Sequence, residues 1–164
     1  HAAPHAGAIA ALVQDDTRSV RKAALEALGK LGAHAAPFLD VIAAWLDDDD
    51  YIGVAALETL SALGKYAAPY ASAIVALMRK GMKKGNRDLV GQAVDALCGL
   101  EELAAPHTDA MLEVVVSNGL DAWPETRVKA AKAAVRALGN DASALGPKLI
   151  GALAAVITNN RYSR

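Results

Sequence analysis

Apolar residues recur at steps of five, eight and nine after each of a series of prolines. The prolines Pro4, Pro37, Pro69 and Pro106 are followed by Ile9, Leu12 and Val13; Ile42, Trp45 and Leu46; Ile74, Leu77 and Met78; and Met111, Val114 and Val115. This spacing places each set on one face of a helix. Because proline has no N–H and a φ that suits a helix, we expect each of these helices to begin at its proline.

A second group of columns indicates a second helix in every unit. A leucine stands nine residues before each of Pro37, Pro69, Pro106 and Pro147. Each leucine has an alanine four residues ahead of it and a leucine or valine three ahead. These columns are Leu28, Leu60, Leu97 and Leu138; Ala24, Ala56, Ala93 and Ala134; and Leu25, Leu57, Val94 and Val135. Acidic or capping residues such as Asp15, Asn86 and Glu125 precede this helix. We expect it to stop at Gly32, Gly64 and Gly139.

The columns divide the chain into similar units, approximately 4–36, 37–68, 69–105 and 106–146, followed by a partial unit 147–164. One helix pair cannot bury its own apolar face, so the pairs must stack on one another. The predicted fold class is therefore all-α, an α-solenoid of stacked antiparallel helix pairs in a right-handed superhelix. Because the partial unit holds a single expected helix, we expect the chain to be a segment of a longer solenoid.

The first unit resembles the HEAT-repeat family through Asp15, Val20-Arg21, Ala24 and Ala27-Leu28-Gly29. The resemblance implies a HEAT or armadillo-like solenoid built from short, alanine-rich repeats, with the second helices on its concave side. It also implies a ladder in which an Asp pairs with an Arg of the neighbouring unit. Only Arg21 fits that role, because the equivalent positions are Gly53, Val90 and Ala131. We therefore expect the apolar columns to hold the units together.

Charge and composition narrow the class of function. The 164 residues include 17 basic and 18 acidic side chains, a balance that gives no general attraction to nucleic acid or acidic membranes. The single cysteine, Cys98, cannot form an internal disulfide, which favours an intracellular location. Apolar runs are too short for a bilayer, which needs about 20 residues, so no membrane span is expected.

Charged residues on the second helices are the main candidates for binding a protein. Glu26, Glu58, Asp95 and Arg136 share one column, and Lys129, Lys132 and Arg136 follow one stripe of a single helix. Like charges at this spacing repel, which indicates an acidic partner, although a solvated face is the alternative. Trp123, in the insertion 117–125, is either an interface anchor or a side chain folded over the helix ends.

The insertion 79–87 is expected to be a basic loop. It carries Arg79, Lys80, Lys83, Lys84 and Arg87. Such a loop suits a phosphate or an acidic protein surface, and a solvated turn is the alternative. It has no aromatic residue on which a base could stack, so nucleic acid is an unlikely partner.

No catalytic or metal-binding constellation emerges from the sequence. His5 and His107 share a repeat position three layers apart, roughly 30 Å at ~10 Å per layer, so they cannot share a metal. Cys98 stands in a column of small residues, so we expect it to be packed in the structure. Trp45 stands at a position expected to be in the core. The acidic run 47–50 lacks the ligand pattern of a calcium-binding loop. We therefore predict a non-catalytic scaffold without a cofactor, which binds other protein subunits in an intracellular assembly. The short repeats also resemble HEAT-like proteins of the bilin-lyase group, which implies tetrapyrrole binding as an alternative.

Overall fold

The computed structural model describes residues 3–48, 51–117, 124–139, 146–147 and 150–151. These residues form helices and connecting turns, with no strand among them, so the predicted all-α class is confirmed for this part of the chain. The α-helices are α1 (Ala3–Leu12), α2 (Arg18–Leu31), α3 (Leu39–Ala43), α4 (Tyr51–Leu63), α5 (Ala71–Lys84), α6 (Arg87–Gly99), α7 (Thr108–Val116) and α8 (Pro124–Leu138). Three 3-10 helices connect them: η1 (Gly32–Phe38), η2 (Gly64–Tyr70) and η3 (Glu101–His107).

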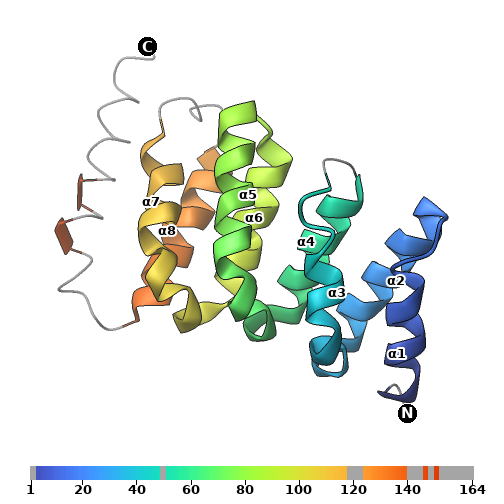
Figure 1. Cartoon of the computed structure of the whole chain (residues 1–164). Helices are drawn as coiled ribbons and strands as arrows, with labels where there is room; N and C mark the ends of the chain where they lie inside the picture. The colour runs from blue at the N-terminus through green and yellow to red at the C-terminus, as the bar shows by residue number, and fades with distance from the viewer. Residues whose placement is uncertain (1–2, 49–50, 118–123, 140–145, 148–149, 152–164) are drawn as a thin grey trace.

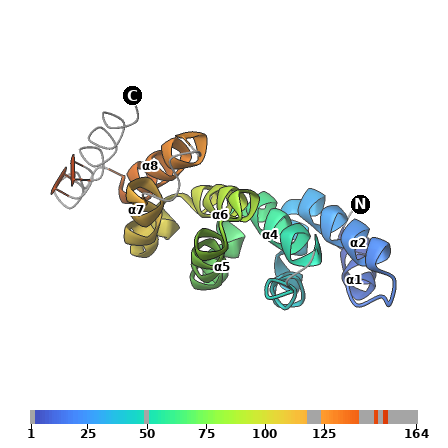
Figure 2. The same cartoon turned by 90° about the horizontal axis from the view of Figure 1, so that it is seen from above.

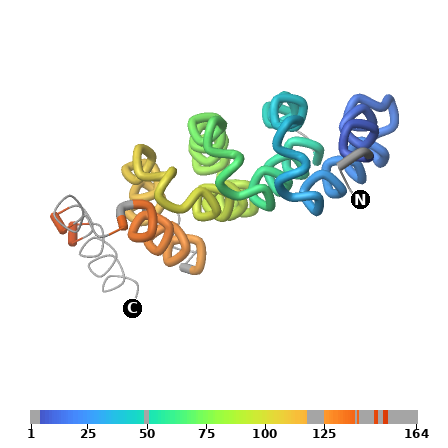
Figure 3. The backbone as a smooth tube through the Cα atoms, turned by 90° about the horizontal axis from the view of Figure 1, so that it is seen from below, coloured from blue at the N-terminus to red at the C-terminus, as the bar shows by residue number. Residues whose placement is uncertain are grey.

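The helices lie in two rows (Figure 1). Helix α2 packs against α4, α4 against α6, and α6 against α8. Helices α1, α3, α5 and α7 form the other row, and each packs against the helix that follows it. Figure 2 shows the two rows from above, bending gently toward the side of α2, α4, α6 and α8, and Figure 3 shows them from below.

The alanine and leucine columns form the core between these helices. Ala24, Ala56, Ala93 and Ala134 are all buried, and the side chains of Leu28, Leu60 and Leu97 are completely covered. Small residues in this column let neighbouring helices approach closely, and the leucines fill the layers between them. Val135 differs from its column, because its side chain is 43% exposed whereas Leu25, Leu57 and Val94 are fully buried.

Pro4 lies at the start of α1, as predicted, but the next three prolines do not begin their α-helices. Pro37, Pro69 and Pro106 lie inside η1, η2 and η3, and the following α-helices begin two residues later. Proline disfavours the α conformation of the residue before it, which leaves a short 3-10 helix as the connection. Each of these turns also buries one alanine completely: Ala35, Ala67 and Ala104.

Glycine ends the second helix of three units, as predicted. Gly32, Gly64 and Gly139 have φ values of +54°, +54° and +52°, which residues other than glycine rarely adopt. Gly32 and Gly64 stand five residues before Pro37 and Pro69, and Glu101 occupies the equivalent position before Pro106 with a φ of +53°. The backbone geometry of the turn is therefore kept where the glycine is missing.

Candidate protein-binding surface

The second-helix face, formed by α2, α4, α6 and α8, carries the charged column singled out in the sequence. Glu58 Oε1 accepts a hydrogen bond from Gln92 Nε2 at 2.9 Å. Asp95 Oδ2 lies 2.9 Å from Lys129 Nζ. Both contacts join one helix of the row to the next. Glu58 and Asp95 therefore stay exposed, as expected, and each is also bonded to the next helix of the row.

Lys22 and Glu26 lie at the other end of this face. Their side chains form an ion pair one helical turn apart, at 3.3 Å. The Lys22 ammonium also lies 4.1 Å from the centre of the Tyr51 ring and donates a hydrogen bond to its hydroxyl. The hydrogen bond to Tyr51 is the main cause of a raised pKa of Lys22. Lys22 therefore connects α2 to the start of α4.

Arg21 is the expected member of an Asp–Arg ladder, but its hydrogen-bond partners lie in its own unit. Its Nη1 donates to the backbone oxygens of Asp15, at 2.8 Å, and Asp16, at 3.0 Å. Its guanidinium lies 5.0 Å from the centre of the Trp45 ring. Trp45 is partly buried and packs against the core, as its column predicted, and its ring also takes part in this cation–π contact.

The other row is joined by polar contacts that the sequence did not reveal. The Tyr70 hydroxyl donates to Asp40, and burial, together with this carboxylate, raises the pKa of Tyr70 to about 12. Arg79 binds both carboxylate oxygens of Glu113, with Nη2–Oε1 at 2.6 Å and Nε–Oε2 at 2.9 Å. The hydrogen bond from Arg79 lowers the pKa of Glu113. Neither pair could have been assigned without knowing which helices are neighbours.

A groove of about 450 Å³ opens on the second-helix face. It is lined by polar and apolar residues of α2, α4 and α6 and of the residues before α6: Lys22, Tyr51, Val54, Ala55, Glu58, Asn86, Asp88, Leu89 and Gln92. Tyr51 is the large exposed residue of the groove, with 55% of its surface accessible. Tyr51 was not singled out from the sequence. Its repeat column holds the polar residues Ser19, Asp88 and Lys129 in the other units, so an aromatic residue there was a signal that could have identified it.

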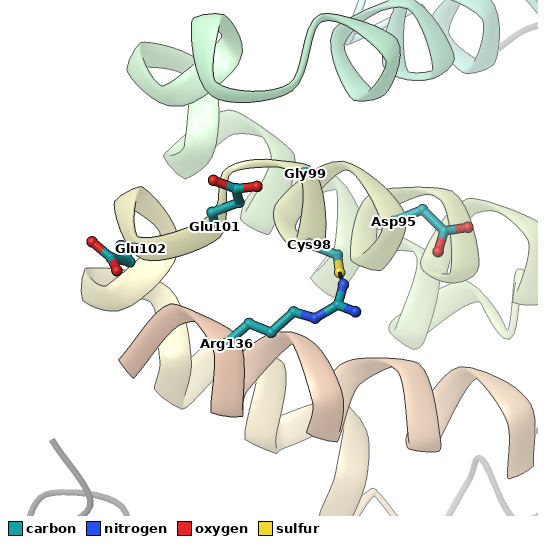
Figure 4. A pocket seen from close by; sticks show the side chains of 6 residues that line it. All are labelled: Asp95, Cys98, Gly99, Glu101, Glu102 and Arg136. Atoms are coloured by element: carbon teal, nitrogen blue, oxygen red, sulfur yellow. Dashed lines mark hydrogen bonds between the residues drawn. The ribbon is translucent and has the colours of Figure 1, made fainter. Parts of the chain in front are cut away.

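A second hollow, of about 530 Å³, lies between the C-terminal half of α6, η3 and α8. Figure 4 shows Arg136 reaching from α8 toward Cys98, with Glu101 and Glu102 on the η3 side. Arg136 Nη1 lies 3.4 Å from Cys98 Sγ. The carboxylate of Asp95 lines the same hollow. The combination of one cation with several carboxylates suits contact with charged side chains of another protein.

The chemistry of this hollow differs from that of a typical hydrolytic site. A nucleophilic cysteine is usually activated by a neighbouring base such as histidine, and none of the described residues that line the hollow is a histidine. In the part of the chain that the structure describes, no cluster of three His, Cys, Asp or Glu residues is placed to hold a metal ion. The described helices also include none long and apolar enough to cross a bilayer.

No family model matches this sequence. The chain also matches no curated protein and no solved structure. The resemblance to HEAT repeats therefore rests on Asp15, Val20-Arg21, Ala24 and Ala27-Leu28-Gly29 and on the repeated columns.

The basic segment 79–87 is not the loop that the sequence predicted. Helix α5 continues to Lys84 and α6 begins at Arg87, so only Gly85 and Asn86 connect them. Gly85, with a φ of +67°, ends α5, and Asn86 Oδ1 accepts the Leu89 N–H at 3.1 Å to cap α6. Cations in the last turn of α5 are favoured by the negative end of the helix dipole.

The remaining predicted residues are separated in space or lie outside the description. Arg79 is engaged by Glu113, and Lys80 and Lys84 also have interaction partners, so the basic residues do not form one free cationic surface. Lys132 is exposed on α8. Trp123 lies outside the described residues, as does most of the partial unit 147–164.

Proposed function

We propose that this chain is a HEAT-like α-solenoid, a right-handed superhelix of stacked antiparallel helix pairs, and that it serves as a non-catalytic scaffold for other proteins. The observation that carries the proposal is the second-helix face. Helices α2, α4, α6 and α8 contact one another in sequence and present two hollows along one continuous surface. An extended surface of this kind suits a protein chain better than a small substrate, which is usually held in a more enclosed pocket.

The groove around Tyr51 is the proposed centre of recognition. Tyrosine is enriched among residues that dominate binding energy, because its ring buries a large apolar area and its hydroxyl bonds to polar groups. Here Lys22 lies over one side of the ring and holds its hydroxyl, so the exposed ring is held in place before a partner arrives. Such pre-organisation reduces the entropy lost on binding.

The other two candidate functions lack a specific supporting observation. Binding of a phosphate or nucleic acid relied on a flexible cationic loop, and residues 79–84 are part of α5 with Arg79 bound to Glu113. Tetrapyrrole binding relied on free acidic residues of the second helices, and Glu58 and Asp95 are bonded to Gln92 and Lys129. The groove contains one exposed aromatic ring, Tyr51, among mainly charged and amide side chains.

The proposal is tested by retention of native partners on the full chain. The wild type, Tyr51→Ala and Tyr66→Ala would be used as bait in extracts of the source cells, and stoichiometric partners would be quantified by mass spectrometry. Tyr66 is a matched control, because it is 39% exposed but lies in η2 rather than in the groove. We expect Tyr51→Ala to lose the partner and Tyr66→Ala to keep it.

Two results would contradict the scaffold proposal. The first is a wild-type chain that retains no stoichiometric protein partner. The second is equal retention by both variants, which would remove the groove around Tyr51 from the interface. Circular dichroism of the three proteins controls for folding, because loss of an exposed tyrosine side chain should leave the helical signal unchanged.

A further inference from the structure

The groove around Tyr51 carries negative charge that the chain itself does not balance. Among the described residues that line it, Lys22 is the one cation, and its ammonium pairs with Glu26 at 3.3 Å. Glu58 accepts its hydrogen bond from the amide of Gln92, which is neutral, and has no cation as a partner among the described residues. A carboxylate can accept about four hydrogen bonds, so Glu58 also keeps capacity for further donors.

Asp88 contributes a second carboxylate to the groove. It is exposed in the first turn of α6 and has no side-chain hydrogen bond or ion pair within the part of the chain that the structure describes. The side-chain oxygen Oε1 of Gln92, another lining residue, is buried and accepts no hydrogen bond. These groups are all acceptors, and hydrogen bonds between a carboxylate and a cationic donor are the strongest that such groups form. The groove is therefore suited to a cationic donor.

Apolar residues share the groove with these acceptors. On α4, Val54 and Ala55 lie between Tyr51 and Glu58 on one helix face, and Leu89 follows Asp88 on α6. A compact cation would leave this apolar surface uncovered, whereas a long basic side chain covers it with its methylene stem. Arginine suits the groove better than lysine, because its planar guanidinium offers several donors to two carboxylates and stacks against an aromatic ring.

Negative charge continues in the second hollow of this face. Glu101 and Glu102 are exposed, and neither has a side-chain hydrogen bond or ion pair among the described residues. Figure 4 shows both carboxylates turned away from Arg136, whose guanidinium lies at Cys98. A basic segment that occupies the groove would therefore meet further carboxylates along the same face.

We propose that the groove around Tyr51 binds an arginine side chain of the partner protein. The guanidinium meets the carboxylates of Asp88 and Glu58, and the methylene stem covers the apolar residues beside them. This inference rests on the proposed scaffold function and names the chemistry of the partner at its central contact. The sequence predicted an acidic partner from the cations of α8, whereas the groove lies on α2, α4 and α6 and favours the opposite charge.

The test uses a tripeptide with one arginine and a matched neutral control. The peptide N-acetyl-Ala-Arg-Ala-amide would be titrated into the isotopically labelled full chain, and the backbone amide signals would be followed by NMR. In the control peptide citrulline replaces arginine, because it has nearly the same shape and no charge. We expect the arginine peptide to bind roughly 10-fold more tightly, because charge-assisted hydrogen bonds are replaced by neutral ones in the control. The signals that move should belong to residues 51–58 and 86–92.

Two variants of the full chain separate the groove from the net charge. Asp88→Asn should weaken the arginine peptide by about 10-fold, because one charge-assisted contact is lost. Asp109→Asn is the matched control and should leave the affinity unchanged. Asp88 and Asp109 are both exposed, and each is the second residue of its helix, but Asp109 lies on α7 in the other row. Glu58→Gln should reproduce the effect of Asp88→Asn, and circular dichroism checks that all three variants keep their helices.

Several results would overturn the inference. Equal affinity of the arginine and citrulline peptides, or no shift with millimolar peptide, removes arginine as the occupant. Equal losses in Asp88→Asn and Asp109→Asn would show that the net charge of the chain attracts the peptide. If Tyr51→Ala releases a native partner while the two peptides bind equally, the arginine inference fails and the scaffold proposal stands. If the arginine peptide binds in the groove but the wild type retains no native partner, the scaffold proposal fails instead.

Discussion

Replacing Glu101 by glycine should stabilise the chain. Glu101 has a φ of +53° at the position where Gly32 and Gly64 end the second helix of the first two units. A residue with a Cβ pays roughly 1–2 kcal/mol for the left-handed region. Glycine also gains conformational freedom in the unfolded chain, which offsets about 0.5–1 kcal/mol of that benefit. The expected net gain in the free energy of unfolding is therefore about 0.5–1 kcal/mol.

Urea denaturation followed by circular dichroism at 222 nm would measure this gain. A midpoint that rises at constant slope indicates a change in stability rather than in the denatured state. Glu101→Gln keeps the backbone penalty and removes the charge, so it separates the two contributions. Gly32→Ala is the reverse control, because its Cβ would meet no atom within 4 Å and any loss reports the φ of +54° alone.

If the positive φ of Glu101 causes the strain, the free energies of unfolding of the three variants must follow a specific order. Glu101→Gly must exceed the wild type, Glu101→Gln must stay close to it, and Gly32→Ala must fall below it by about 0.5–1 kcal/mol, because the same offset in the unfolded chain applies in reverse. If Glu101→Gln stabilises as much as Glu101→Gly, the charge near Glu102 and Asp95 is the cause and the reasoning from φ is wrong. If Glu101→Gly destabilises, the side chain makes a contact that outweighs the strain.

Three further outcomes follow from packing and charge. Leu57→Ala should lower the free energy of unfolding by about 2–5 kcal/mol, because this side chain is fully buried. Val135→Ala should lower it by less than about 0.5 kcal/mol, because Val135 is 43% exposed. Similar losses for both variants in urea melts would refute the argument that burial by the next helix stabilises this column. Arg79→Gln should lower the urea midpoint only slightly at pH 7, because the pair with Glu113 is about half exposed and is screened by solvent. The pKa of Glu113 is lowered by Arg79, so the pair stabilises the fold above the ordinary carboxyl pKa near 4.5 and this stability is lost as the pH falls and Glu113 is protonated. A difference between Arg79→Gln and the wild type that persists at pH 2 would contradict the pairing. Gly81→Ala should cost about 1–3 kcal/mol in the same melts, because its Cβ would lie 2.9 Å from a side chain of α6; an unchanged midpoint would show that the helices can separate freely.

The repeat spacing predicted the helical class and much of the core because burial constrains side-chain size. Ala24, Ala56, Ala93 and Ala134 are buried as a column, and Gly32 and Gly64 end their helices with positive φ. These features depend on residue size and backbone freedom, which a single sequence displays directly. Positions repeated at one spacing must meet similar surroundings, so four units support one interpretation better than any one of them.

The sequence failed where the outcome depends on neighbours far along the chain. Contacts such as Glu58–Gln92 and Arg79–Glu113 join residues 34 positions apart, and their geometry is set by how one helix pair packs on the next. Lys129 was placed in a repelling stripe because its partner Asp95 lies on a different helix. The basic segment was assigned to a loop because it is an insertion relative to the shorter units, and insertions in repeat proteins usually lie in loops. Gly81 instead serves close packing inside α5.

Residues that break the repeat are the best guide to recognition on this surface. A column that is filled by one residue type in every unit serves the packing that all units share, and carries no information about a particular partner. Tyr51, Arg136 and Val135 each depart from their columns by type or by exposure, and all three lie on the second row of helices. Because Glu58, Asp95 and Lys129 are already bonded within the chain, a partner would compete with those contacts for part of their hydrogen-bonding capacity. Affinity should therefore depend on the departures from the columns more than on the charged column itself.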